Sequence, residues 1–208
     1  MNFLSRFAVF CALGATLGGC ALVDIANSPA PQFFTLTAAP AASDEGAPSP
    51  AMILVDDFTA SAALNSARIA YQPNPNELKY FAGARWIDLA PLMVRNLTVE
   101  TLENSHRFAS VAARGAEIRG DYVLKGDIRQ FAAEGADGKL QVRIDFFMRV
   151  VSNVNRTVVA AKDFTAVEPV EASGIASIVT AYDKALARNL AAITDWTAAS
   201  TLATNTAQ

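Results

Sequence analysis

The clearest pattern in the sequence is a strict alternation of apolar and polar residues over 140–150. Six apolar side chains recur at every second position and would share one face of a strand: Leu140, Val142, Ile144, Phe146, Met148 and Val150. A period of two is typical of a strand with one face in the core and the other in water. Strand-like segments at 122–131 and 157–165 flank it across turn-rich sequences, so we predict an antiparallel meander of three strands.

The apolar period changes to 3.6 residues near the C-terminus. Eight large side chains keep one helical face over about six turns: Ile175, Ile178, Val179, Tyr182, Leu186, Leu190, Ile193 and Trp196. Full burial of such a side chain contributes about 1.5–3 kcal/mol before entropy is counted, so we expect this helix to lie across the sheet. After Trp196 the sequence is rich in Thr, Ala and Ser, and we expect a disordered tail at 198–208.

A second helix is predicted from Asp88, as its N-cap, to about Asn104, with Pro91 in the first turn. Its apolar residues form two seams on a helical wheel. One seam holds Leu89, Met93, Val94 and Leu97, and the other holds Leu92, Val99 and Leu102. The second seam is covered either by a loop of the same chain or by a partner, so Leu92, Val99 and Leu102 are candidate partner contacts.

Shorter strands are expected in the first half of the chain. The segments 32–37 and 52–55 are apolar enough for strands. The segments 68–71 and 77–81 flank a Pro-Asn-Pro-Asn turn, which predicts a hairpin. Residues 58–66 are small and give no clear pattern.

This order of elements predicts an α+β fold. We expect a single domain with a mixed, mostly antiparallel sheet, which includes the meander of the C-terminal half, and two helices packed on it. The domain would span 32–197, after a lipid-anchored tether at 20–31.

The N-terminal segment 1–19 is typical of a signal peptide, because its apolar run from Phe7 to Leu17 is too short to span a bilayer. It ends in Leu-Gly-Gly-Cys, which resembles the bacterial lipobox closely. Small residues there allow a lipoprotein signal peptidase to approach the backbone, and diacylglycerol would be joined to the thiol of Cys20. The alternative is an ordinary secretory leader that contains a cysteine.

Processing would change the composition of the chain. Removal of residues 1–19 from the 208 leaves 189, with 16 basic and 20 acidic residues, a balance of about −4 that argues against a nucleic-acid or polyanion partner. Cys11 would leave with the leader and Cys20 would carry lipid, so the mature chain has no thiol for a disulfide. No later segment has the ~18 consecutive apolar residues of a spanning helix.

The sequence offers few catalytic groups. His106 is the only histidine, and a surface imidazole at the end of a helix is ordinary. No Gly-x-Ser-x-Gly turn and no phosphate-binding glycine loop occur. We therefore expect no enzymatic activity, no metal site and no cofactor, although carboxylate pairs for glycoside cleavage stay open because their spacing is set in three dimensions.

Several local blocks, in this order, resemble one family. They are Gln32-Phe33-Phe34-Thr35-Leu36, Arg68-Ile69-Ala70-Tyr71, Tyr80 with Arg85-Trp86, the segment 122–131, and a terminal helix ending in Trp196. The mature chain looks like an ABC-type transport auxiliary lipoprotein of the PqiC/YmbA-like family. Gln72 stands where related sequences often have an arginine, so the role of that charge does not carry over.

The resemblance implies a mixed sheet with two helices and a non-enzymatic adaptor in a lipid-transport system. The implied partner is an MCE-domain protein, and self-association is left open. Ala21, rather than aspartate, follows Cys20, so we expect an outer-membrane protein that faces the periplasm. The alternatives are a structural envelope lipoprotein without a transport role and a periplasmic hydrolase.

Overall fold

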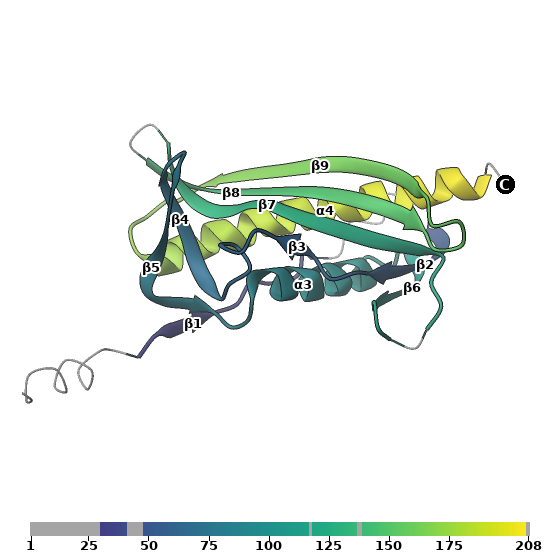
Figure 1. The fold of residues 1–208 in the computed structure, drawn as a ribbon, viewed down its shortest axis with the longest axis horizontal. Coiled ribbons are helices and arrows are strands. Elements are labelled where there is room, and N and C mark those ends of the chain that lie inside the picture. Colours follow the sequence, from purple (N-terminus) through teal and green to yellow (C-terminus); the bar gives the residue numbers. More distant parts are fainter. Residues whose placement is uncertain (1–29, 41–47, 117, 137–138, 207–208) are drawn as a thin grey trace, which may run out of the picture. The chain divides into compact units, whose positions relative to one another are not determined.

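Strand β7 (Tyr122–Ala136) is the centre of the sheet in the computed structural model, which describes residues 30–40, 48–116, 118–136 and 139–206. Gln32–Gln208 form one structural unit. On one side β7 pairs along its length with antiparallel β8 (Lys139–Ser152), and β8 pairs with antiparallel β9 (Val158–Pro169) (Figure 1). The predicted meander is confirmed.

The other side of β7 has three parallel partners in succession. Its first part pairs with β2 (Ser49–Val55), its middle with β3 (Thr59–Ala60), and its last part with β4 (Arg68–Asn74). These pairings join segments that are far apart in the sequence. Strand β3 lies within residues 58–66, whose sequence shows no clear pattern.

Three more strands complete the nine-stranded sheet. Strand β5 (Glu77–Trp86) forms the predicted hairpin with β4, and β1 (Gln32–Phe34) adds to β5 in parallel. Strand β6 (Phe108–Ala113), which the sequence pattern did not predict, pairs in parallel with β2. The α+β class and the mixed sheet are therefore confirmed.

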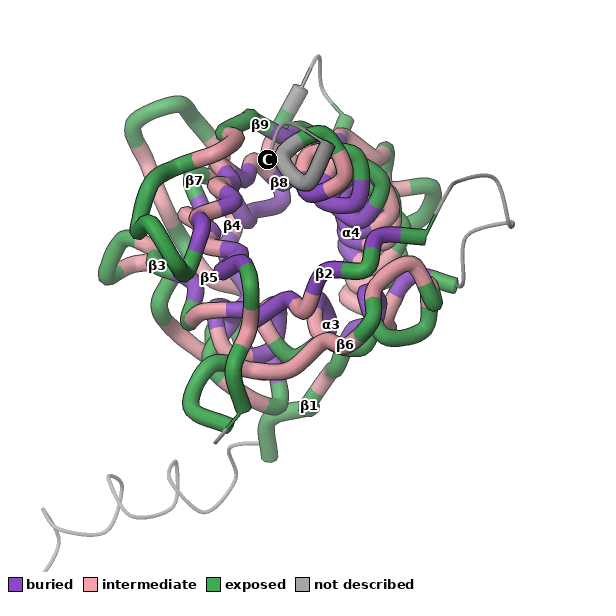
Figure 2. The backbone as a smooth tube through the Cα atoms, turned by 90° about the vertical axis from the view of Figure 1, so that its right-hand side faces the viewer, coloured by how far each residue is buried: buried purple, intermediate pink, exposed green. Residues whose placement is uncertain are grey.

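Helices α3 (Ala90–Asn104) and α4 (Ile175–Thr206) pack on this sheet. Viewed along the sheet, buried residues of β7, β8 and α4 face the interior (Figure 2). At one end of the core the rings of Trp86, Phe131 and Tyr182 contact one another, with centroids 5.1–6.0 Å apart. The Tyr182 hydroxyl donates to the carbonyl of Ala70 at 2.9 Å, and burial raises the pKa of Tyr182. No helix of the described residues has an apolar stretch long enough to cross a bilayer.

The start of α3 differs from the prediction that Asp88 is its N-cap. Leu89 occupies the N-cap position without a side-chain hydrogen bond, and the Asp88 carboxylate accepts instead from the backbone N–H of Leu89 at 2.7 Å. The N–H of Ala90 donates to Ser66, so the chain is still held by the preceding loop where the helix begins.

The end of α4 also differs, because the helix continues to Thr206 and the expected disorder from 198 onward is wrong for 198–206. The hydroxyls of Thr197 and Thr201 donate back to carbonyls four residues earlier. The buried Thr201 hydroxyl also lies 2.9 Å from the hydroxyl of Ser49 on β2. The contact with Ser49 ties α4 to the sheet at Thr201, although the composition of this segment resembles a tail.

Candidate functional site: a groove at the start of α3

A groove of about 290 Å³ lies where the first turns of α3 meet the segments that flank β3. Seven residues line it: Asp57, Phe58, Asn65, Leu89, Pro91, Leu92 and Arg95. Leu89 is 43% exposed and Leu92 is partly exposed, whereas Phe58 belongs to the core. The groove therefore has an apolar floor that is continuous with the interior and an apolar rim that faces solvent.

One ion pair marks the polar side of the groove. Arg95 Nη2 lies 3.1 Å from Asp57 Oδ1, with the arginine side chain 17% exposed and the aspartate 84% exposed. The Nε atom of Arg95 is buried and has no hydrogen-bond partner among the described residues. The guanidinium thus has one donor without a partner among the described residues, and the carboxylate that pairs with it faces solvent.

The structure separates the three candidate contact residues of the second seam. Leu92 lines the groove, and Val99 is partly buried against the core. Leu102 is only 1% exposed and belongs to the core, so its side chain cannot meet a partner on this surface. For Leu102 the intramolecular alternative holds, while Leu92 and Val99 stay candidate contacts.

Other residues of the groove could not be found from the helical wheel. Leu89 falls on the opposite seam in that projection, but it precedes the helix, and the wheel does not apply there. Phe58 and Arg95 join Leu92 only through the tertiary fold. Cys20, the predicted lipid attachment site, lies outside the described residues. His106 follows α3 with a φ of 52° and is exposed, as is typical of the residue that ends a helix.

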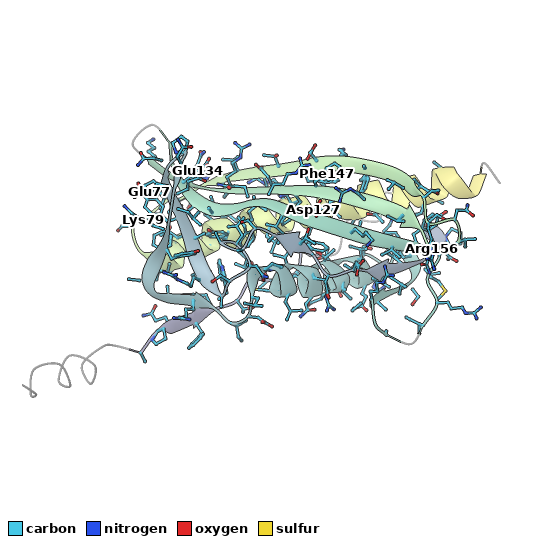
Figure 3. The ribbon with its side chains drawn as sticks, viewed as in Figure 1. Glu77, Lys79, Asp127, Glu134, Phe147 and Arg156 are labelled. Carbon is cyan, nitrogen blue, oxygen red and sulfur yellow. The ribbon has the colours of Figure 1, made fainter. Side chains whose placement is uncertain are left out.

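The outer face of the meander, where the sequence places mixed charges, is internally paired. Ion pairs join Arg129 to Asp163 at 2.5 Å, Arg143 to Asp145 at 2.8 Å and Arg149 to Asp127 at 2.8 Å. A hydrogen bond from Thr59 lowers the pKa of Asp127; burial opposes this and Arg149 adds to it. Figure 3 shows Asp127 and Phe147 along the meander, with Arg156 at one end and Glu134 at the other, where Glu77 and Lys79 of the neighbouring strand β5 also lie.

Two polar hollows flank this face. The first, of about 390 Å³, is lined from β4, β7 and β8 by residues that include Gln72, Arg143 and Asp145. The second, of about 340 Å³, includes Arg114, Lys125 and Arg156. The described residues contain no group of three or more His, Cys, Asp or Glu side chains placed to hold a metal ion.

Asp56 forms ion pairs with two of the basic side chains that line the second hollow. It lies 2.8 Å from Lys125 and 3.2 Å from Arg114. Burial alone would raise the pKa of Asp56, but the hydrogen bond and charge of Lys125 and the charge of Arg114 hold it below its ordinary value. Asp56 and Asp57 thus pair with different arginines, Arg114 and Arg95.

Comparison with known proteins identifies the family. Residues 34–194 match the family model of the ABC-type transport auxiliary lipoprotein component, and the chain belongs to this family. The uncharacterized protein bll6063 of Bradyrhizobium diazoefficiens is 30% identical over 151 residues, which cover 71% of this chain and 39% of that protein. The chain therefore matches well under half of that relative's length.

Two solved structures are similar to this chain. The crystal structure of protein XCC0632 from Xanthomonas campestris, of family DUF330, is similar with a TM-score of 0.80 and 25% identity, covering 84% of this chain and 99% of that one. Protein CT253 from Chlamydia trachomatis has a TM-score of 0.52 at 7% identity, covering 73% and 98% of the two chains, which shows likeness of fold alone.

Proposed function

We propose that this protein is the lipid-anchored, non-enzymatic adaptor of an ABC-type system that transports lipid between membranes, and that it binds an MCE-domain protein. Membership of the transport auxiliary lipoprotein family carries this proposal. The protein would be held in the outer membrane by diacylglycerol on Cys20 and would face the periplasm. The lipobox-like sequence before Cys20 and the Ala21 that follows it support this location.

The groove at the start of α3 supports a role in binding a protein. Leu89 and Leu92 present apolar surface to solvent, and Arg95 can pair with a carboxylate from outside because its own partner, Asp57, is 84% exposed. An apolar anchor beside a partly buried arginine is typical of the residues that dominate interface energies. The occupant we propose is an apolar side chain of the MCE-domain protein with an adjacent acidic residue.

The buried side of α3 would keep this groove rigid. Met93 and Val94 are 4% and 0% exposed, and the hydroxyls of Thr98 and Thr101 donate to carbonyls within the helix. A contact surface on an element that is fixed in the core loses little conformational entropy when it binds. The groove therefore needs no rearrangement of the sheet to accept a partner.

Affinity capture from native membranes tests the proposal. The tagged wild-type protein should retain the MCE-domain protein, with the permease and ATPase of the same system. Leu92→Asp should reduce this capture about 30-fold, because a hot-spot residue contributes about 2 kcal/mol or more. Val158→Asp is a matched control, since Val158 is 56% exposed on β9, away from the groove.

Each result separates the alternatives. A wild-type protein that captures no transport component would favour a structural envelope lipoprotein. Hydrolysis of esters or glycans by the purified protein would favour the hydrolase. Full capture by a well-folded Leu92→Asp variant would exclude the groove as the contact while leaving the adaptor role intact.

A further inference from the structure

The outward face of β1, β5 and β4 carries a row of residues that the groove does not use. Phe33 of β1 pairs with Arg85 of β5, and Arg85 pairs with Arg68 of β4. Residues directly opposite one another on neighbouring strands project to the same face, so these three side chains form one row. Ile87 is two residues beyond Arg85, and its N–H donates to Phe34, so it continues the alternation. We call Phe33, Arg68, Arg85 and Ile87 the arginine row.

The charges of the arginine row are not balanced within the described residues. Among the described residues, no ion pair joins Arg68 or Arg85 to a carboxylate. The Arg68 guanidinium instead lies 3.6 Å from the ring centroid of Tyr80. The Asp88 carboxylate accepts a hydrogen bond from the N–H of Leu89. Two like charges directly opposite each other repel, so an anion supplied from outside would relieve this repulsion.

The contrast with the rest of the sheet makes this arrangement notable. Arginines on the outer face of the meander each lie within 2.5–2.8 Å of an aspartate oxygen: Arg129, Arg143 and Arg149. The two arginines of the row have no such partner in the described residues, although they belong to two of the blocks that carry the family resemblance. Neither charge is neutralised by a carboxylate within the described part of the chain, so both guanidinium groups can bind an external anion, that of Arg68 while it lies over the ring of Tyr80.

Large apolar side chains lie beside these two charges. Phe33 is 63% exposed and Ile87 is 67% exposed. Burial of such side chains at the boundary of headgroups and acyl chains, with arginines on the phosphates, is how proteins lie on an anionic bilayer. A free phosphate would bind the arginines but would leave Phe33 and Ile87 in water, so the row fits a lipid surface.

The arginine row begins only a short tether after Cys20, the predicted lipid attachment site, so the nearest lipid surface is the membrane that holds this lipid. Residues 21–31 separate Cys20 from Gln32, and eleven residues span at most about 36–40 Å. Phe33 is the second residue of β1, where the chain joins the sheet after this tether. The turn between β8 and β9, with Arg156, lies at the far end of the sheet from β1 (Figures 1 and 3).

We propose that the arginine row docks on the anionic headgroups of the same bilayer that holds the diacylglycerol of Cys20. This inference rests on the lipid anchoring in the proposed function. Docking would add a second membrane contact to the lipid and would fix the orientation of the sheet, so that the β8–β9 turn points away from the membrane.

Fluorescence quenching tests the docking with the purified, lipidated protein. The Phe33→Trp variant is placed in vesicles of phosphatidylcholine, with or without phosphatidylglycerol, whose acyl chains carry bromine. The tryptophan at position 33 should be quenched in the anionic vesicles, whereas one introduced by Val158→Trp should not. The unsubstituted protein gives the signal of Trp86 and Trp196, which is subtracted.

Charge variants complete the test in the Phe33→Trp protein. Loss of both arginines, by Arg68→Gln and Arg85→Gln, should lower the ratio of docked to undocked protein about 25-fold, because each basic residue near an anionic surface contributes about fivefold. Arg156→Gln removes an equivalent charge at the other end and should change nothing.

Two results would overturn the docking in a lipidated protein: quenching at position 33 no greater than at position 158, or equal quenching with and without phosphatidylglycerol. The mass of the purified protein is measured in the same preparation. A mass without the diacylglyceryl group would contradict the proposed anchoring and the docking that rests on it. A lipidated but unquenched protein would contradict the docking alone.

Discussion

Truncation of two leucines of α3 should have different effects on stability, because one lies on the core side of this helix and the other on its exposed side. Leu102 is 1% exposed, so Leu102→Ala removes a fully buried side chain and leaves a cavity. Substitutions of this type lower the free energy of unfolding by about 2–5 kcal/mol. For a domain of this size each kcal/mol lowers the melting temperature by about 2–4 °C, so the expected loss is about 4–20 °C.

Leu92→Ala should behave differently, because Leu92 is partly exposed in the groove. We expect it to lower the free energy of unfolding by about 1 kcal/mol or less. Thermal melts followed by far-UV circular dichroism measure both variants, and affinity capture on the same proteins reports partner binding. Leu102→Ala that melts within about 2 °C of the wild type, yet loses the partner, would show that Leu102 belongs to an interface and would refute this reasoning.

Three further substitutions test other parts of the structure. Cys20→Ala should abolish lipidation and signal-peptide cleavage, and mass spectrometry that finds the variant processed and lipidated as usual would exclude the anchor. Asp56→Asn should lower the free energy of unfolding by about 0.5–1 kcal/mol at pH 7, because the carboxylate pairs with Lys125. Since the folded-state pKa of Asp56 is lowered, this difference should persist above the ordinary value of 3.8 and shrink as pH falls through the folded-state pKa, which urea unfolding at several pH values can follow. Tyr182→Phe should cost about 1 kcal/mol, because the buried hydroxyl bonds to Ala70, and an unchanged melting temperature would contradict that.

The sequence predicts best those elements whose pattern is local. The alternation over 140–150 predicts β8 correctly. In the structure every second residue from Val142 to Val150 is buried, so the apolar period in the sequence matches the buried face of the strand. The hairpin of β4 and β5 follows from its turn residues. In contrast, β6 and the parallel pairings of β7 depend on contacts between distant segments, which no local period records.

The candidate site shows the same division between local and tertiary information. The helical wheel finds Leu92 as an apolar residue beyond the core seam, but it also selects Leu102, because it cannot tell which neighbour covers each side of a helix. Leu89 is missed because it lies just outside the helix. The two arginines of the arginine row stand out in the sequence, yet only the strand register places them opposite each other.

Crosslinking from inside the groove tests the central claim most directly. A photo-reactive amino acid replaces Leu92 in the full-length protein in cells, and after irradiation the crosslinked partner is identified by mass spectrometry. We expect an adduct with the MCE-domain component of an ABC-type transport system, and no such adduct when the same amino acid replaces Val158. Failure to crosslink any component of a transport system from position 92, in a protein that is lipidated and folded, would contradict the proposed adaptor contact.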